Sequence, residues 1–80
     1  MEINLKLFGI TKDIYGKGEE KIQLEGKPTV ADFLDNLKKK YTGLADLSSL
    51  LVAVNNEYAE PDMKLADNDE VALIPPVSGG

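Results

Sequence analysis

Apolar side chains recur at helical spacing between residues 30 and 41, and this stripe constrains the fold more than any other feature of the sequence. The pair Thr29 and Asp32 has the spacing of a capping box at a helix start. Lys38–Lys40 come late, where cations suit the helix dipole, and Gly43 is a suitable carboxyl-terminal stop. The stripe consists of Val30, Phe33, Leu34, Leu37 and Tyr41. One amphipathic helix is expected, with a single apolar face to pack on a sheet.

The segments on either side of this helix have the character of strands, because they alternate apolar and polar residues or are short and apolar. Strands are predicted at residues 3–8, 21–25, 51–54 and 71–74, with a short edge strand at 58–59. Turn-forming residues lie between them, at 12–18, 55–56 and 67–69. The segment 44–50 is ambiguous and compatible with a short helical turn.

The order of these elements predicts the fold class. A chain of 80 residues has the size of one domain. Two antiparallel hairpins that flank one helix give an α+β fold, with a mixed sheet of four to five strands and one main helix across one face. The β-grasp (ubiquitin-like) fold matches this order, whereas a ferredoxin-like fold would need a convincing second helix. A single β-grasp domain is expected over residues 1–80, with a flexible carboxyl-terminal tail at 75–80.

Composition excludes several classes of function. Without Cys or His, the chain has no thiol nucleophile and no zinc site built on these residues. The carboxylates of Asp67, Asp69 and Glu70 are ordinary for a turn, and no metal site is predicted. A net charge of −5 and the absence of Arg argue against nucleic-acid binding and favour a partner with a basic surface. Neither a signal peptide nor a membrane span is evident, so a cytoplasmic protein that does not contact membranes is expected.

The carboxyl-terminal residues carry the strongest functional signal. Pro75 and Pro76 end the last predicted strand, since Pro cannot donate to a sheet. Val77, Ser78, Gly79 and Gly80 follow. Six residues reach about 20 Å when extended, and the last three carry almost no side chain. Such a segment can enter a narrow channel in another protein and present a carboxylate, which becomes an acyl donor once a nucleotide activates it.

Four segments of this sequence resemble the small subunit of molybdopterin synthase, the MoaD family. The most specific is VALIPPVSGG at residues 71–80. The segment LADNDE at 65–70 is similar to the family's turn, with Asn68 in place of Gly, and both residues accept positive φ. VAVNNEY at 52–58 and LFG at 7–9 are also similar, whereas KDIYG at 12–16 departs from the usual Arg-Glu pair before glycine. The resemblance spans essentially the whole chain.

The resemblance implies a sulfur carrier for molybdenum cofactor biosynthesis. In that family an ATP-dependent activating enzyme adenylates the terminal glycine, here Gly80, which then becomes a thiocarboxylate. The residues Pro75, Pro76, Val77, Ser78 and Gly79 would form the arm that enters the large subunit, where sulfur passes to a pterin precursor. The implied assembly is a heterotetramer whose catalytic residues lie in the large subunit. The chain itself would be non-catalytic and hold no cofactor stably, with ATP used by the activating enzyme.

Other functions remain open on the sequence alone. The same fold could carry sulfur for thiamine or for tRNA thiolation, or act as a ubiquitin-like protein modifier. A freestanding enzyme would need a catalytic set that the sequence lacks. A simple interaction domain with an idle tail is a further alternative.

Strand parity predicts a docking surface beside the tail. Side chains alternate between the two faces of a strand, so Phe8 and Ile74 are expected on the face opposite the helix, on neighbouring first and last strands. Tyr58 is expected to extend this patch. Phe8 could instead fold over the sheet edge into the core, and the acidic turn near Asp67 and Asp69 is the alternative docking surface.

Overall fold

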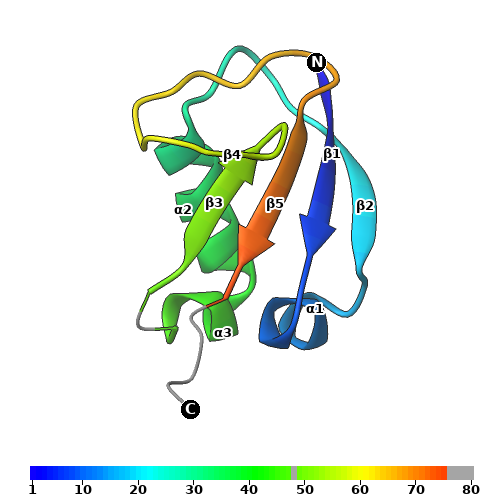
Figure 1. Cartoon of the computed structure of the whole chain (residues 1–80), viewed down its shortest axis with the longest axis vertical. Helices are drawn as coiled ribbons and strands as arrows, with labels where there is room; N and C mark the ends of the chain where they lie inside the picture. Colours follow the sequence, from blue (N-terminus) through cyan, green and yellow to red (C-terminus); the bar gives the residue numbers. More distant parts are fainter. Residues whose placement is uncertain (48, 76–80) are drawn as a thin grey trace.

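The computed structural model describes residues 1–47 and 49–75. Five strands form one mixed sheet in the order β2-β1-β5-β3-β4 (Figure 1). Strands β1 and β5 pair in parallel, and the other neighbours are antiparallel. The elements are β1 (Glu2–Leu7), α1 (Ile10–Tyr15), β2 (Glu19–Gln23), α2 (Val30–Lys40), α3 (Thr42–Ala45), β3 (Leu51–Val54), β4 (Glu57–Tyr58) and β5 (Glu70–Ile74). The predicted α+β architecture, with a mixed sheet and one main helix, is confirmed.

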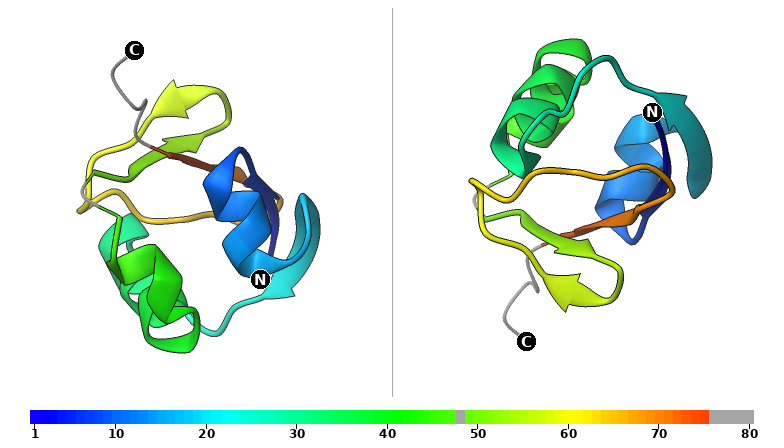
Figure 2. Two further views of the ribbon diagram at one scale, coloured as in Figure 1. Left: turned by 90° about the horizontal axis from the view of Figure 1, so that it is seen from below. Right: turned by 90° about the horizontal axis from the view of Figure 1, so that it is seen from above.

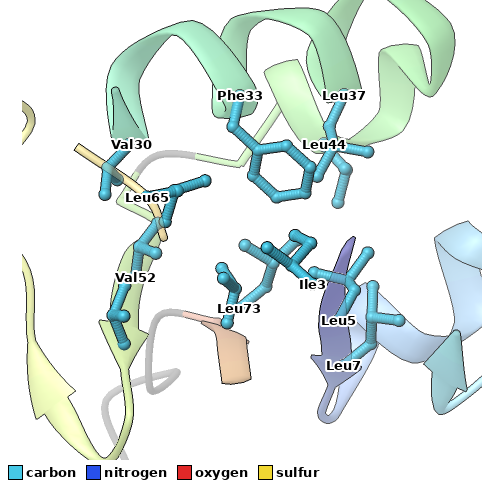
Figure 3. Packing of buried hydrophobic residues seen from close by; sticks show 12 residues of the cluster. Ile3, Leu5, Leu7, Val30, Phe33, Leu37, Leu44, Val52, Leu65 and Leu73 are labelled. Carbon is cyan, nitrogen blue, oxygen red and sulfur yellow. The ribbon is translucent and has the colours of Figure 1, made fainter. Parts of the chain in front are cut away.

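Helix α2 begins at the predicted capping box. The Thr29 hydroxyl accepts a hydrogen bond from the Asp32 amide at 3.1 Å, and the Asp32 carboxylate accepts one from the Thr29 amide at 3.3 Å. These two bonds satisfy amides that have no partner within the helix. The apolar stripe then points at the sheet, where the Phe33 ring lies above Leu73 and Ile3 (Figure 3). The predicted helix and its buried face are confirmed.

Alternation along β1 and β5 separates a core face from an open face. The parallel register places Leu5 beside Val71 and Leu7 beside Leu73, and all four side chains are buried. The intervening residues of both strands, such as Lys6 and Ala72, are only partly buried. Within the described residues, the helices lie on the core side of the sheet (Figure 2). The opposite face is therefore left without a helical cover.

Asparagines form the two turns that the sequence predicted near the last strands. Asn55 and Asn56 have φ of 52° and 71°. Positive φ at both residues is what a two-residue hairpin turn between β3 and β4 requires. Asn68 has φ of 68°, so it does adopt the conformation that favours glycine. The predicted short edge strand is present one residue earlier, at Glu57–Tyr58.

The predicted turn at residues 12–18 is wrong, because α1 occupies most of it. Gly9 enters the helix with φ of 55° and ψ of −133°, and Gly16 ends it with φ of 96°, donating its amide to the Lys12 carbonyl at 2.8 Å. Thr11 within α1 is fully buried. Strands β1 and β2 are antiparallel neighbours as expected, but the connection between them contains this helix. Gly16 and Gly18 made the segment look like a turn, although the six residues before Gly16 form a short helix.

Gly43 does not end the main helix, which is a second correction. Helix α2 stops at Lys40, and Gly43 lies inside the short helix α3, where a Cβ atom would come within 3.0 Å of Ile14 Cγ2 in α1. The glycine thus allows α1 and α3 to approach each other, while Leu44 beside it is fully buried. A helical turn is present near the ambiguous segment 44–50, but it lies at residues 42–45 and overlaps only the start of that segment.

Candidate functional site

The predicted reactive arm leaves the sheet at the end of a central strand. Strands β1 and β5 run in the same direction, so both end at the same edge (Figure 1). Pro75 directly follows β5 and is half-buried. The other predicted site residues of the arm lie outside the described residues: Pro76, Val77, Ser78, Gly79 and Gly80. The described part of the site therefore consists of Pro75 and the surface around it.

The structure brings together the three residues predicted for the docking surface. Phe8, Tyr58 and Ile74 line one open hollow of about 400 Å³ on the face of the sheet without helices. Phe8 is 51% exposed and Tyr58 is 72% exposed, so Phe8 does not fold into the core. The remaining lining residues are Lys6, Ala53, Asn56, Glu70 and Ala72. We call these eight residues the open-face patch.

Sequence reasoning missed three residues in or beside this patch. Leu51 pairs directly with Ile74 across the β3–β5 ladder and is 50% exposed, so it extends the apolar surface. Lys6 and Glu70 form an ion pair at 3.1 Å within the patch, and the hydrogen bond and charge of Glu70 raise the pKa of Lys6. Only the strand register shows that these residues meet. The patch thus combines apolar anchors with one polar pair.

Phe8 is held in place by Thr11 in the first turn of α1. The Thr11 hydroxyl accepts a hydrogen bond from the Phe8 amide at 3.0 Å and donates one to the Phe8 carbonyl at 2.6 Å. The same oxygen lies 3.5 Å from the Leu73 carbonyl oxygen in β5. A buried hydroxyl with these partners fixes the backbone at Phe8 relative to the end of β5. The docking anchor and the base of the arm therefore share one support.

The acidic turn is occupied by structural hydrogen bonds. Asp67 accepts from the Glu2 amide at 2.7 Å. Asp69 accepts from the Ala66 amide at 2.8 Å and from the Asn55 side chain at 2.9 Å. In residues 1–47 and 49–75, no group of three or more acidic side chains is placed to hold a metal ion. These carboxylates tie the turn to the sheet.

A second hollow, of about 350 Å³, lies on the helical side between β2 and α2. At its edge the Tyr15 hydroxyl donates to Glu20 at 2.6 Å, and Lys17 donates to the same carboxylate at 2.7 Å. Burial raises the pKa of Tyr15, and the bond to Glu20 raises it further. The Glu20 carboxylate is thus committed to two donors.

These features define a class of protein. A five-stranded mixed sheet with its main helix on one face, and a carboxyl-terminal strand in the centre of the sheet, is the arrangement of β-grasp, ubiquitin-like proteins. The profile of the ThiS family matches residues 5–80. The chain belongs to the ThiS family. None of the described helices has the length and apolar character to cross a membrane.

Relatives and solved structures agree with this assignment. The molybdopterin synthase sulfur carrier subunit of Dictyostelium discoideum is 37% identical over 83 residues, covering 99% of this chain and 96% of that protein. SAMP1, the small archaeal modifier protein 1 of Haloferax volcanii, is 30% identical with a TM-score of 0.83 and full coverage of both chains. A putative molybdopterin converting factor subunit 1 from Pyrococcus furiosus is 27% identical with a TM-score of 0.86, covering 96% of this chain and 99% of that one. The β-grasp prediction is confirmed.

Proposed function

We propose that this chain is the sulfur carrier subunit of a molybdopterin synthase, with the carboxylate of Gly80 as its working group. The observation that carries the proposal is the Gly79–Gly80 sequence that follows a central strand in a ThiS family member. The similarity to the Dictyostelium sulfur carrier subunit over nearly the whole length of both chains supports it. A bare glycine carboxylate lets the backbone of a partner approach the reacting carbon closely.

The proposed chemistry has three steps at Gly80. Its carboxylate oxygen attacks the α-phosphorus of ATP in an activating enzyme, which forms an acyl adenylate and releases pyrophosphate. Hydrosulfide from a sulfur source then attacks the carbonyl carbon, AMP leaves, and a proton is lost to give the thiocarboxylate. In the large subunit the thiocarboxylate sulfur attacks a carbon of a pterin precursor and displaces a leaving group from it. Water then cleaves the acyl–sulfur bond, which restores the carboxylate and leaves the sulfur on the pterin.

The division of labour follows from what this chain offers. Its described residues form the open-face patch and the base of an arm, and the carboxylates of the acidic turn are used in structural hydrogen bonds. We therefore assign the catalytic residues and the pterin pocket to the large subunit, and ATP to the activating enzyme. The open-face patch is the surface proposed to dock on both partners.

Intact mass tests this function. The purified chain is incubated with its adenylating enzyme, ATP and sulfide. Its mass should rise by the difference between sulfur and oxygen, and the change should map to the peptide that contains Gly80. A variant without Gly79 and Gly80 serves as the matched control and should gain nothing. A mass gain on an internal residue, or the same gain in the truncated variant, would overturn the proposal.

A second candidate function is covalent modification of other proteins. The similarity to SAMP1 of Haloferax volcanii, the small archaeal modifier protein 1, favours it. The activated end would be the same, but the acceptor would be a lysine amine, which displaces AMP or sulfide to form an amide. Conjugates that survive denaturation and thiols, with this chain joined through Gly80, would establish it. If a deletion strain loses molybdenum cofactor and the wild-type strain contains no such conjugates, the carrier function is supported and protein modification is not.

A further inference from the structure

Gly9 lies beside the base of the arm and has no part in the chemistry proposed above. Gly9 follows Phe8 at the end of β1, next to the point where Pro75 follows β5. A Cβ atom on Gly9 would lie 3.0 Å from Pro75 Cγ. Any larger residue at this position would therefore have to displace the proline ring.

The backbone at Gly9 is also restricted. Its φ of 55° and ψ of −133° belong to a region that residues with side chains rarely adopt. The next turn holds this conformation, because the Lys12 amide donates to the Gly9 carbonyl at 3.1 Å and the Thr11 amide donates to the Phe8 carbonyl at 3.1 Å. The backbone of Gly9 is therefore held in one conformation beside the Pro75 ring.

We propose that Gly9 is a positioning residue, which sets the direction in which the arm leaves Pro75 when the open-face patch is docked on a partner. Phe8 on one side of Gly9 belongs to that patch, and the Thr11 hydroxyl, which holds the Phe8 backbone by two hydrogen bonds, lies 3.5 Å from the Leu73 carbonyl oxygen at the end of β5. The docking anchor and the base of the arm thus keep one relative orientation. When the patch is docked, the arm must enter the partner from Pro75, so the packing of Pro75 against Gly9 affects how readily Gly80 reaches the reacting atoms.

This inference rests on the proposed sulfur-carrier function, and it makes a specific kinetic prediction. Misplacing a reacting group by about 1 Å can cost about a hundredfold in rate. In adenylation by the activating enzyme, Gly9→Ala should lower kcat at least about tenfold and leave the KM for the carrier within about twofold, since the patch still docks. Phe8→Ala should do the reverse and raise KM.

Matched variants separate the contact from backbone strain. Gly26 has φ of 69° and nothing within 4 Å of its Cβ position, so Gly26→Ala carries the strain of positive φ without the clash. This control should leave both kcat and KM unchanged. Pro75→Ala removes the same contact from the opposite side and should itself lower kcat. In the Pro75→Ala background, Gly9→Ala should not lower kcat further, because the proline atom with which its Cβ would clash is gone.

The outcomes distinguish this inference from the function on which it rests. Wild-type chain that fails to support ATP–pyrophosphate exchange overturns the sulfur-carrier function and the inference with it. Wild-type activity together with an unchanged kcat for a folded Gly9→Ala overturns only the positioning role. An equal loss of kcat in both Pro75 backgrounds also overturns it. If circular dichroism shows that Gly9→Ala does not fold, the test rests on Pro75→Ala. An unchanged kcat for Pro75→Ala then contradicts the inference.

Discussion

Asn55 shows how a single side chain can serve a turn and a sheet at once. Its backbone adopts the positive φ that the hairpin requires. Its side-chain amide donates to Asp69 at 2.9 Å, and its side-chain oxygen accepts from the Glu70 amide at 3.0 Å. The turn between β3 and β4 is therefore fastened to the start of β5. The neighbouring Asn56 has a similar φ, but within the described residues its side chain makes no hydrogen bond.

The pair of asparagines allows backbone and side-chain effects to be measured separately. Glycine accepts positive φ at both positions, so Asn55→Gly removes only the side-chain hydrogen bonds, one of them to a partly buried carboxylate. We expect it to lower the free energy of unfolding by about 1–3 kcal/mol. Asn56→Gly should change it by less than about 0.5 kcal/mol. Urea unfolding followed by circular dichroism gives both values, and equal losses would show that the turn conformation alone matters.

At the scale of the elements, success or failure of sequence reasoning follows the range of the interactions involved. Helix α2 could be predicted because its cap and apolar stripe lie within one segment, and the strands could be predicted because alternation is local. Helix α1 could not, because its packing against α3 and the end of β5 is long-range, although the two hydrogen bonds of Thr11 to Phe8 are local. The meeting of Phe8 with Ile74 followed from strand parity. Leu51 and the ion pair of Lys6 with Glu70 needed the exact register, which parity does not supply.

The hydrogen bond between α1 and β2 predicts a response to pH. Burial and the Glu20 carboxylate raise the pKa of Tyr15 above its ordinary value of 10.0, so the folded chain holds the phenol proton more tightly than the unfolded chain. This contribution to stability is present below pH 10 and is lost as the pH rises from there toward the raised pKa. Glu20→Gln should lower the pKa of Tyr15, although burial keeps it above the ordinary value.

The Tyr15 ring carbon that bears the hydroxyl reports this titration by NMR. Glu19→Gln is the matched control, because Glu19 is exposed and its carboxylate bonds Asn4 at 3.2 Å instead. That variant should leave the Tyr15 titration where it is in the wild type. An equal shift in both variants would mean that general charge, and not the Glu20 bond, acts on Tyr15.

On the scale of the whole molecule, the fold places the proposed docking surface next to the base of the proposed reactive arm. The core side of the sheet is covered by α2 (Figure 2). The open face carries Phe8, Tyr58, Ile74 and Leu51. A single exposed apolar residue needs no explanation, but a cluster of them beside a reactive arm does. With a net charge of −5, the chain suits partners with basic surfaces, whose opposite field speeds encounter.

Removing two anchors tests whether this cluster is the docking surface. Phe8→Ala combined with Ile74→Ala should weaken binding to the large subunit and to the activating enzyme by at least about 2 kcal/mol, or roughly thirtyfold. Isothermal titration calorimetry measures both affinities, and circular dichroism checks the fold. Ile10→Ala is the control, since Ile10 is 50% exposed but does not line the hollow. Unchanged affinity in the double variant would place docking elsewhere, with the acidic turn as the next candidate.

The position of β5 has a consequence for protein synthesis. It is the central strand, and it joins the β2–β1 pair to the β3–β4 pair, yet it is made after all of them. A nascent chain that stops before Glu70 leaves two separate strand pairs, and a lone hairpin is at best marginally stable. Products that end before β5 therefore lack a folded open-face patch. Because β5 is both central and last, a growing chain can form the proposed docking surface only when synthesis has reached the strand that immediately precedes the arm.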